Sequence, residues 1–535
     1  MNENLSKNKG DIPKEFMVDI PVIQKEYLIN GEILEWEGDL QEVYSPICEN
    51  KGGSQVQIML GKYPLLTETE ALQALDAATN AYKNGRGKWP TMSIAERIGH
   101  VEIFIEKIIV KREEVINLLM WEIGKSYADS IKEFDRTVDY IKDTIKALKE
   151  LDINSSKFVT IQGVIGQIKR SPLGVVLCMG PFNYPLNETF TTLIPALIMG
   201  NAVIFKPPKY GVLLHRPLLE AFRSSFPQGV INAVYGEGQK IIGPLMASGK
   251  INSLAFIGSS KVANILQKQH PKPHRCRFVL GLEAKNASII LPDADIDLTV
   301  KEHLLGTLSY NGQRCTAIKI IFVHKSVRDR FIDDFCNKVD NLKCGMPWDK
   351  DVQITPLPET GKVGYMKELL TDADNKGGKV VNKKSGEGGG TLFFPAVVFP
   401  VNSEMRLYNE EQFGPIVPIV EFEDIEEPIQ YVINSNYGQQ ISIFGKDSDT
   451  IAKLIDPLVN QVCRVNINSQ CQRGPDEFPF TGRKDSAEGT LSVSDALKVF
   501  SIRTLVATKD VGLNKNIMKE IVSGKKSNFL TGDNL

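Results

Sequence analysis

Two short runs, G-V-V-L-C-M-G-P (174–181) and N-A-V-I-F-K-P-P (201–208), set the fold class. Each is apolar and ends in Gly or Pro, and both are rich in residues that favour strands, so each predicts a short buried strand. A helix is predicted at 213–226, and further strands are predicted at 231–236 and 253–260. Strands that alternate with helices indicate a parallel sheet covered on both faces.

A second α/β block follows in the chain. Strands are predicted at 287–291 and 318–324, with a helix through 306–312 between them and another helix at 329–342. The stretch 377–393 is rich in Gly and Lys and predicts an exposed hairpin or loop.

The two ends of the chain have different patterns. Residues 1–65 predict a polar arm with short strands at 26–33 and 42–47. From 67 to 151, apolar residues recur at three- and four-residue spacing, which predicts amphipathic helices. The polar segment 514–535 predicts a frayed tail.

The length, net charge and cysteine pattern of the chain indicate its number of domains, its partners and its compartment. A chain of 535 residues is too long for one hydrophobic core, so two or three domains are expected. A net charge of −2 gives no long-range field that would attract nucleic acid or an anionic membrane, and neither is expected as a partner. The cysteines form no C-x-x-C pair, which favours a reducing, cytoplasmic location. They are Cys48, Cys178, Cys276, Cys315, Cys336, Cys344, Cys463 and Cys471.

Three kinds of segment are not expected. The polar start of the chain lacks the apolar core of a secretory signal. The most apolar run, 193–205, is broken by Pro195, Gly200 and Asn201 and is too short to span a bilayer. The six histidines form no metal-ligand spacing, so no metal site is predicted.

Cys315 stands in Y-N-G-Q-R-C-T-A (310–317) and differs from an ordinary free cysteine in its neighbours. Most free cysteines are small buried hydrophobes. Here Gly312 gives the backbone freedom, and Arg314 places a positive charge beside the sulfur. Both features favour an accessible thiolate, the form that attacks electrophiles.

The motif G-Q-R-C-T (312–316) resembles the nucleophile motif of the aldehyde dehydrogenase superfamily. The resemblance covers roughly residues 25 to 510 and implies an aldehyde dehydrogenase-like α/β fold with a Rossmann-type cofactor domain. Five other motifs stand in the family's order: G-P-F-N-Y-P-L (180–186), F-K-P-P (205–208), F-I-G-S-S (256–260), E-E-Q-F-G-P (410–415) and P-F-T-G-R-K-D-S (479–486).

Within the superfamily, R-T (136–137), F-N-Y-P (182–185), G-Q-R-C-T and Q-R-G-P-D-E-F-P-F (472–480) look most like the non-phosphorylating, NADP-dependent glyceraldehyde-3-phosphate dehydrogenases. This resemblance implies oxidation of glyceraldehyde 3-phosphate to 3-phosphoglycerate without phosphate capture. Another small aldehyde, such as succinic semialdehyde or lactaldehyde, is the alternative substrate. A protein that kept the fold and lost the chemistry is a third hypothesis.

The implied reaction begins at Cys315, which attacks the aldehyde carbon to give a thiohemiacetal and then a thioester. Asn183 can donate its side-chain amide to the oxyanion beside the backbone N–H of Cys315. Asn183 could instead be a turn residue before Pro185. A base must then activate water to release the acid.

The expected cofactor is NADP, with NAD possible, although the chain lacks the G-x-G-x-x-G loop. Gly258 and Ser259 join a strand to a helix whose N–H groups could hold the pyrophosphate, and Ser259 could also be an ordinary helix cap. The resemblance places Lys206 on the adenosine ribose, although a solvated strand end is also possible. Glu411 and Phe413 match the family's nicotinamide-ribose contacts.

Lys209 carries the expected preference for NADP. Relatives that prefer NAD often have Glu at this position, where it pairs with the ribose 2′-hydroxyl. A lysine attracts a 2′-phosphate instead.

The resemblance places Arg136, Tyr184, Arg314 and Arg473 around the substrate. A phosphorylated aldehyde carries about two negative charges near neutral pH, so a basic pocket is expected. For Arg136, the alternative is a surface ion pair with its neighbours Asp135 or Asp139.

The base is the open question. The family's base is a Glu four positions before a lysine, but Gly281 stands four positions before Lys285. Glu283 lies two positions later, where a strand would present it on the same face, and an apolar surround would raise its pKa. Glu283 is therefore the candidate base. It could also form a structural buried pair with Lys285 or another cation, leaving deacylation slow or to another carboxylate such as Glu411.

The predicted domains are a cofactor domain (1–157 and 173–284), a catalytic domain (285–490), an oligomerisation arm (158–172 and 491–510) and a tail (511–535). An arm of this kind pairs sheets between subunits, so a homodimer or homotetramer is expected.

Overall fold

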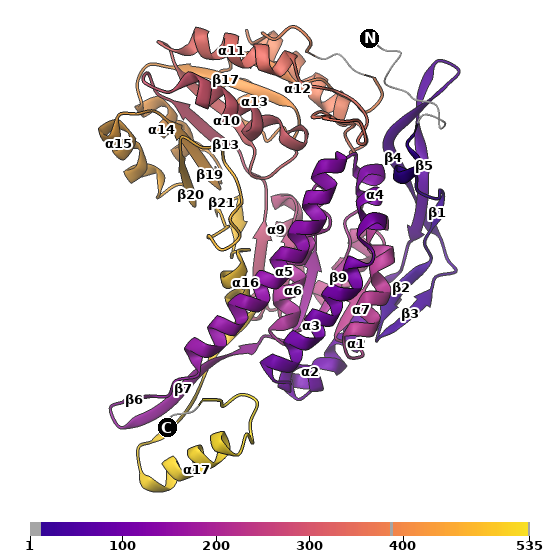
Figure 1. Cartoon of the computed structure of the whole chain (residues 1–535), viewed down its shortest axis with the longest axis vertical. Helices are drawn as coiled ribbons and strands as arrows, with labels where there is room; N and C mark the ends of the chain where they lie inside the picture. The colour runs from indigo at the N-terminus through magenta and orange to yellow at the C-terminus, as the bar shows by residue number, and fades with distance from the viewer. Residues whose placement is uncertain (1–11, 386–388, 533–535) are drawn as a thin grey trace.

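The computed structural model describes residues 12–385 and 389–532. Parts of three predicted segments lie outside the described residues: 1–11 of the polar arm, 386–388 of the Gly/Lys-rich loop and 533–535 of the tail. Figure 1 shows two layered α/β units, one above the other, and a narrow arm at the lower end.

The lower unit is built on an eight-stranded sheet of order β22-β12-β11-β8-β9-β10-β2-β3. The five neighbouring strands in its middle are parallel, which confirms the predicted alternation of strands and helices. Its edge strands pair antiparallel, so the sheet is mixed. The bounds are β8 (Val175–Met179), β9 (Ala202–Lys206), β10 (Ile231–Ala233), β11 (Ser253–Ile257), β12 (Arg277–Gly281), β2 (Glu26–Ile29), β3 (Glu32–Glu35) and β22 (Ala487–Glu488).

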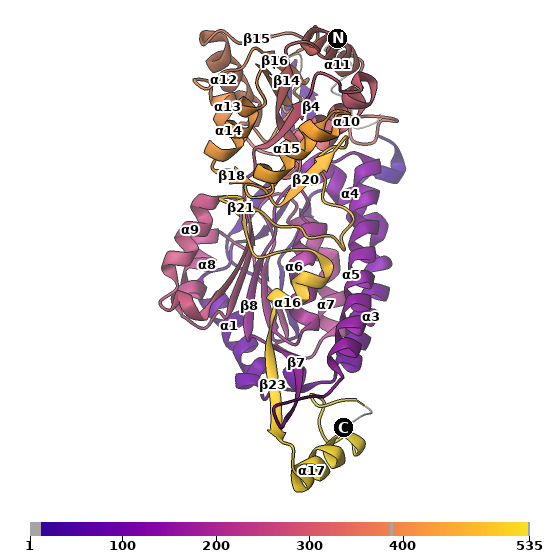
Figure 2. The same cartoon turned by 90° about the vertical axis from the view of Figure 1, so that its left-hand side faces the viewer.

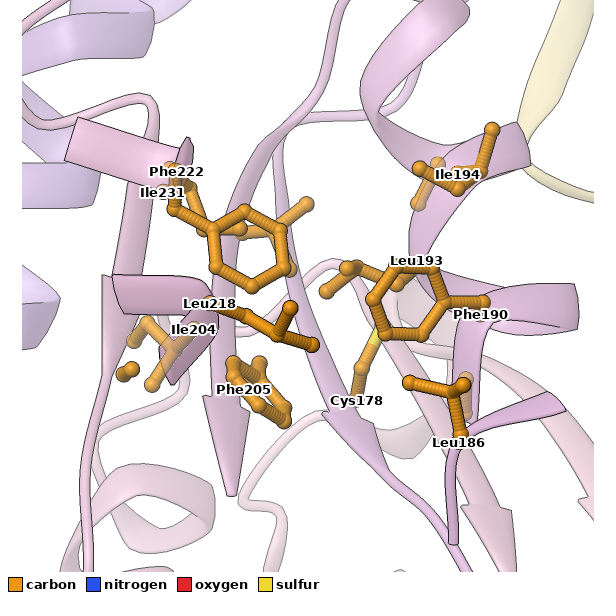
Figure 3. Packing of buried hydrophobic residues seen from close by; sticks show 14 of the residues in the cluster. Cys178, Leu186, Phe190, Leu193, Ile194, Ile204, Phe205, Leu218, Phe222 and Ile231 are labelled. Atoms are coloured by element: carbon orange, nitrogen blue, oxygen red, sulfur yellow. The ribbon is translucent and has the colours of Figure 1, made fainter. Parts of the chain in front are cut away.

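The helix α6 (Asn187–Ile198) joins β8 to β9 and is buried along its whole length. Figure 3 shows its Phe190 and Leu193 beside Cys178 of β8, and Phe222 of α7 (Leu219–Ser225) beside Phe205 of β9. The ring centres of Phe205 and Phe222 are 5.9 Å apart. Each such side chain contributes roughly 1.5–3 kcal/mol through burial, so α6 is held firmly against the sheet.

Helices surround this sheet, as predicted for 67–151. Capping boxes start two of them, since Thr67 with Glu70 and Ser93 with Glu96 satisfy the first backbone N–H groups. The helices are α1 (Glu68–Tyr82), α2 (Lys88–Thr91), α3 (Ile94–Ile109), α4 (Arg112–Ile123), α5 (Tyr127–Ser155), α8 (Gly238–Ala247), α9 (Ser260–Gln269) and α16 (Val493–Val499). A hairpin of β4 (Leu40–Lys51) and β5 (Ser54–Pro64), with β1 (Val22–Ile23), lies at one side.

The upper unit holds a seven-stranded sheet of order β15-β16-β17-β14-β13-β19-β20. All its pairs are parallel except β15 with β16, of which β15 lies inside the predicted Gly/Lys-rich stretch and β16 just after it. The strands are β13 (Asn286–Ile290), β14 (Ile318–His324), β15 (Lys379–Val380), β16 (Ala396–Phe399), β17 (Ile416–Phe422), β19 (Gln440–Phe444) and β20 (Arg464–Ile467). The helices are α10 (Ile296–Leu308), α11 (Arg328–Asp340), α12 (Lys362–Asn375), α13 (Arg406–Asn409), α14 (Glu426–Asn434) and α15 (Ser448–Leu458), and β18 (Tyr437–Gly438) pairs with β21 (Arg483–Lys484).

The arm is a three-stranded antiparallel sheet of β6 (Val159–Ile161), β7 (Val164–Pro172) and β23 (Ser501–Lys509). Figure 2 shows β7 and β23 running below the larger sheet, with α17 (Gly512–Ser523) beyond them. The prediction of a frayed tail was therefore wrong. Met518 is buried, and Thr531 accepts and donates hydrogen bonds with Gln167, so the tail packs against the arm.

None of the helices in the described part of the chain combines the length and the apolar character needed to cross a membrane.

Candidate active site

Cys315 lies in the loop between α10 and β14, at the junction of the two units. The loop turns sharply because Gly312 has a φ of +70°. A Cβ at that position would lie 2.8 Å from the carbonyl oxygen of Thr307 and 2.9 Å from that of Gly414, so only glycine fits. The freedom predicted for the backbone at Gly312 is thus not what the structure shows, since the position is tightly enclosed, and the half-buried thiol lies shortly before β14.

Two side chains hold the backbone of Cys315 in place. Its carbonyl accepts a hydrogen bond from Asn286 Nδ2 at 2.8 Å and another from Lys319 Nζ at 3.0 Å. Lys319 is buried and also pairs with Glu411, with 2.8 Å between nitrogen and oxygen. The positive charge of Lys319, on β14, is thereby held near the backbone of Cys315.

The surroundings of the thiol differ from the prediction. Burial raises the pKa of Cys315, the charge of Glu188 raises it further, and Lys319 and Arg473 oppose the rise. The guanidinium of Arg314 points away, because it donates to the carbonyls of Leu305 and Gly306 at the end of α10 (3.0 and 2.9 Å). The expectation that the Arg314 charge stands beside the sulfur was therefore wrong, and burial favours the protonated form of the thiol.

Asn183 is brought to the loop that carries Cys315. Its side-chain Nδ2 donates to the carbonyl of Gln313 at 2.8 Å, two residues before the sulfur. The backbone carbonyl of Asn183 accepts a hydrogen bond from Nζ of the buried Lys125 at 2.8 Å. An amide carries two N–H donors, so one remains for a second acceptor after the bond to Gln313.

A buried ion pair holds the backbone of Asn183 in place. Lys125 pairs with Glu133, and both side chains are fully buried. The other carboxylate oxygen of Glu133 accepts the backbone N–H groups of Leu186 and Asn187 at 3.0 and 3.2 Å, where α6 begins. The pair thus joins α5 to the first turn of α6 and fixes the segment between β8 and α6.

Arg136 and Arg473 belong to one charge network. Arg136 makes a bidentate pair with Asp476, at 2.7 and 3.0 Å, and neither of its predicted neighbours Asp135 and Asp139 is that partner. Arg473 is buried, pairs with Glu188, and reaches the same Asp476 at 3.2 Å. Two arginines therefore face two carboxylates, which neutralise them.

Tyr184 is in contact with Lys125, the lysine that donates to the backbone carbonyl of Asn183. Lys125 Nζ is 3.6 Å from the centre of its ring. Burial raises the pKa of the Tyr184 hydroxyl, and the nearby charges of Arg314 and Arg136 oppose that rise. The charges of Arg136 and Arg314 thus reach Tyr184, Arg473 is linked to Arg136 through Asp476, and the binding of substrate by these four residues stays a prediction.

The two predicted cofactor lysines follow β9. Lys206 donates one hydrogen bond, to the carbonyl of Pro207 at 3.2 Å, and burial lowers its pKa to about 8. An ammonium has three donors, so Lys206 can also bind ribose hydroxyls. Lys209 is exposed, with its ammonium 5.5 Å from the ring centre of Tyr210, and is free to meet a phosphate. Both residues fit an anionic nucleotide.

The start of α9 holds the other predicted phosphate contacts. Ser259 caps the helix, since its hydroxyl accepts from the N–H of Val262 at 3.4 Å. Gly258 comes immediately before, and its N–H donates to the carbonyl of Gly281 at 2.9 Å. The positive N-terminus of α9, which follows the carboxyl end of β11, fits the pyrophosphate of a dinucleotide.

Glu283 also lies at this helix end. Strand β12 ends at Gly281, so Glu283 is in the connection to β13 and not one pleat along a strand as predicted. Its carboxylate accepts the backbone N–H of Ser260 at 2.8 Å. The pairing with Lys285 that was considered is absent from the described hydrogen bonds, where Lys285 donates to Gln412 at 2.7 Å.

Glu411 and Phe413 reach the site on the loop before β17. Besides its pair with Lys319, Glu411 accepts the N–H of Ala284 at 3.1 Å. Phe413 has a φ of +42°, a strained value for a bulky residue, and its ring centre is 5.8 Å from that of Phe182. Strain of this kind persists only where the surroundings enforce it.

Sequence reasoning missed four charged residues of this site: Lys125, Glu188, Lys319 and Asp476. Glu188 did carry a signal, because it is the only charged residue in the buried segment N-E-T-F-T-T-L-I-P-A-L-I of α6. Lys319 carried a similar one at the start of an apolar strand. Asp476 carried none, since its partner Arg136 is 340 residues away.

Within residues 12–385 and 389–532, no group of three or more His, Cys, Asp or Glu side chains could hold a metal ion.

Comparison with known proteins places this geometry in a family. A family model described as "Aldehyde dehydrogenase family" matches residues 54–506. The NADP-dependent glyceraldehyde-3-phosphate dehydrogenase of Streptococcus equinus is 32% identical over 481 residues, which is 88% of this chain and 96% of that protein. The protein of the same name from Pisum sativum is 31% identical, over 83% of this chain and 89% of its own length.

A solved structure agrees with these relatives. The NADP-dependent glyceraldehyde-3-phosphate dehydrogenase of Bacillus halodurans C-125, complexed with NADP, superposes with a TM-score of 0.83 at 31% identity. The match covers 91% of this chain and 100% of that one.

Proposed function

Since the chain belongs to the aldehyde dehydrogenase family, we propose that it oxidises glyceraldehyde 3-phosphate to 3-phosphoglycerate with NADP, without phosphate capture. The observation that carries the proposal is the joining of Asn183 to the Cys315 loop by the bond to Gln313. The names of the relatives at 31–32% identity support the same substrate and cofactor.

The chemistry follows from the residues present. The thiol of Cys315 gives up its proton to solvent as its sulfur bonds to the aldehyde carbon, and the carbonyl electrons move to oxygen. The second N–H of the Asn183 amide donates to that oxyanion, which stabilises the thiohemiacetal. Bound NADP would supply the acceptor for the hydride that leaves the thiohemiacetal carbon, which gives the thioester. Water then hydrolyses the thioester and frees the thiol.

The residues that would hold NADP are Lys206 on the adenosine ribose, Lys209 on the 2′-phosphate and the α9 N-terminus, with Gly258 and Ser259, on the pyrophosphate. Glu411 and Phe413 would contact the nicotinamide ribose. The carboxylate of Glu283 now accepts the N–H of Ser260, so it must share or release the helix end when a phosphate arrives.

The phosphate of the substrate would be bound by Arg314 and Arg136, beside the hydroxyl of Tyr184. Arg314 has backbone carbonyls as partners, which leaves its charge uncompensated. Arg136 is about one-third exposed on its side chain and can turn from Asp476 toward a dianion. Arg473, which is buried and paired twice, holds the wall of the pocket in this proposal.

A panel of aldehydes tests the function. The rate of nicotinamide reduction at 340 nm is measured with glyceraldehyde 3-phosphate, glyceraldehyde, lactaldehyde and succinic semialdehyde, each with NADP and with NAD. The expected result is the highest kcat/KM with glyceraldehyde 3-phosphate and NADP. A higher value for an uncharged aldehyde would contradict the phosphate site.

One observation favours the second candidate, the oxidation of another small aldehyde such as lactaldehyde or succinic semialdehyde. Asp476 and Glu188 neutralise Arg136 and Arg473, which leaves a less basic pocket than the three arginines alone would give. The same panel separates the two candidates.

We further propose that the enzyme is a cytoplasmic homodimer or homotetramer that assembles through its arm. The arm exposes apolar side chains on β6, β7 and β23, among them Ile161, Ile168 and Leu505, and such a surface is typical of a subunit interface. Eight unpaired cysteines support a reducing compartment. Light scattering during size exclusion measures the oligomer, and a monomer would contradict this assembly.

A further inference from the structure

Hydrolysis of a thioester needs a group that takes a proton from water, and three carboxylates near the Cys315 loop can be compared for that role: Glu283, Glu411 and Glu188. Glu283 is engaged at the N-terminus of α9, where it accepts the N–H of Ser260. Glu411 is engaged with Lys319 and with the N–H of Ala284. Glu188 is engaged too, with Arg473, but Arg473 has a second carboxylate partner in Asp476, and the aldehyde chemistry assigns Glu188 no role.

Glu188 is an unusual residue for its position. It lies in the second position of α6, a helix whose twelve residues are all buried, and its side chain is 9% exposed. Burying a carboxylate is costly unless it is paired and hydrogen-bonded, and here Arg473 is the partner. A residue retained at such a cost in an otherwise apolar helix is a candidate for function.

Glu188 is linked to the Cys315 loop through the start of its own helix. The loop that bears Cys315 is tied to Asn183, which stands five residues before Glu188 at the entry to the same helix. Arg473 joins Glu188 to the carbonyl of Leu491 at 3.1 Å and to Asp476. After burial, the charge of Glu188 is the largest influence on the pKa of Cys315, ahead of those of Lys319 and Glu411.

We propose that Glu188 is the base that activates water for hydrolysis of the Cys315 thioester, a step that rests on the proposed function. Its carboxylate removes a proton as the water oxygen bonds to the thioester carbon, and the carbonyl electrons move to the oxygen held by Asn183. The carbon–sulfur bond then breaks with its electron pair on sulfur. The sulfur takes the proton from Glu188, and the product acid loses its own to solvent.

The charge network suits this cycle. When Glu188 holds a proton, Arg473 keeps Asp476 as its partner, so no buried cation is left unpaired. Burial and the charge of Glu188 both favour the protonated form of Cys315, which helps the leaving sulfur to take the proton back. The base is thus regenerated within the site.

The test uses 4-nitrophenyl acetate, because this ester acylates a reactive thiol and releases coloured 4-nitrophenolate without aldehyde or nucleotide. The full-length wild type should show a burst of one 4-nitrophenolate per site followed by steady release. Glu188→Gln should keep the burst, and its steady rate should fall by about 100-fold or more, as loss of a general base predicts. Peptide mass mapping should find the acetyl group on Cys315.

Three further variants sharpen the test. Glu477→Gln changes an exposed carboxylate of the same loop as Arg473 and should deacylate at the wild-type rate. Glu188→Asp keeps a charge for Arg473 but withdraws it from the site, so it should fold and deacylate slowly even if the amide variant does not fold. In Glu188→Gln/Gly281→Glu, a new carboxylate enters beside Leu491, since a Cβ at 281 would lie 3.7 Å from Leu491 Cδ1, and turnover should return.

Two results would overturn the proposal: a wild-type steady rate in Glu188→Gln or Glu188→Asp, or accumulation of acetyl-Cys315 in Glu283→Gln instead. Absence of any burst in the wild type would instead defeat the proposed nucleophile, and with it both proposals. A burst with the ester but no activity on glyceraldehyde 3-phosphate would concern substrate choice alone and leave the role of Glu188 supported by the ester data.

Discussion

The ammonium of Lys125 donates a hydrogen bond to the backbone carbonyl of Asn183 at 2.8 Å, from a position with no exposed surface. Its charge is balanced by Glu133, whose carboxylate receives the first N–H groups of α6. The oxyanion donor is therefore positioned by a buried ion pair on another helix, and the stability of the fold and the geometry of the site depend on the same contact.

Replacement of Lys125 by Met should destabilise the protein by about 3–5 kcal/mol, because Glu133 would be left buried without its partner. Urea unfolding followed by tryptophan fluorescence measures the change. Lys132→Met, an exposed lysine beside Glu133 on α5, is the control and should stay within about 0.5 kcal/mol of the wild type. A similar small change in Lys125→Met would show that the pair contributes little.

Lys319 should control the reactivity of the nucleophile. Burial raises the pKa of Cys315, and the positive charge of Lys319 opposes that rise. In Lys319→Met the pKa should be higher still, so alkylation by iodoacetamide should be slower at pH 7.5 and its pH profile should move upward, by about tenfold in rate for each pKa unit. Lys325→Met, beyond the end of the same strand, should react like the wild type, and equal rates in both variants would rule out the effect.

Lys209 should set the choice of nucleotide. Lys209→Glu replaces the charge that attracts the 2′-phosphate with one that repels it and can pair with the 2′-hydroxyl. The ratio of kcat/KM for NADP to that for NAD should therefore invert. Lys268→Glu, an exposed lysine in the last turn of α9, controls for charge reversal alone. An unchanged ratio in Lys209→Glu would remove this residue from the cofactor site.

Arg136 should matter for a phosphorylated aldehyde and little for a neutral one. In Arg136→Gln, Asp476 keeps Arg473 as its partner, so the fold should tolerate the change. Loss of a charged hydrogen bond to the phosphate should raise KM for glyceraldehyde 3-phosphate by about tenfold to a hundredfold, with little effect on propanal. Arg223→Gln, at an exposed surface pair, is the control. Equal effects on both aldehydes would point to a structural role for Arg136.

The sequence predicted the parts of this protein that depend on local pattern. The apolar runs at 174–181 and 201–208 gave β8 and β9, and the three- and four-residue spacing gave the long helices around them. The helix predicted through 306–312 was wrong in its bounds, because α10 runs from Ile296 to Leu308 and the chain turns before Gly312.

Side-chain direction at loops could not be predicted in the same way. Glu283 was expected on a strand face, but β12 ends two residues earlier and the carboxylate turns to the N–H groups of α9. Arg314 was expected beside the sulfur, but the carbonyls at the end of α10 attract its guanidinium. Such outcomes depend on partners that the fold brings together from distant segments, as it does for Arg136 and Asp476.

Trapping of the covalent intermediate tests the role of Cys315 most directly. The enzyme is mixed with glyceraldehyde 3-phosphate and NADP, quenched in acid during turnover, digested and examined by mass spectrometry. A 3-phosphoglyceroyl group on the peptide that contains Cys315, and loss of NADPH formation in Cys315→Ser, are the predicted results. NADPH formation by the serine variant, with no acyl group on that peptide in the wild type, would contradict the mechanism.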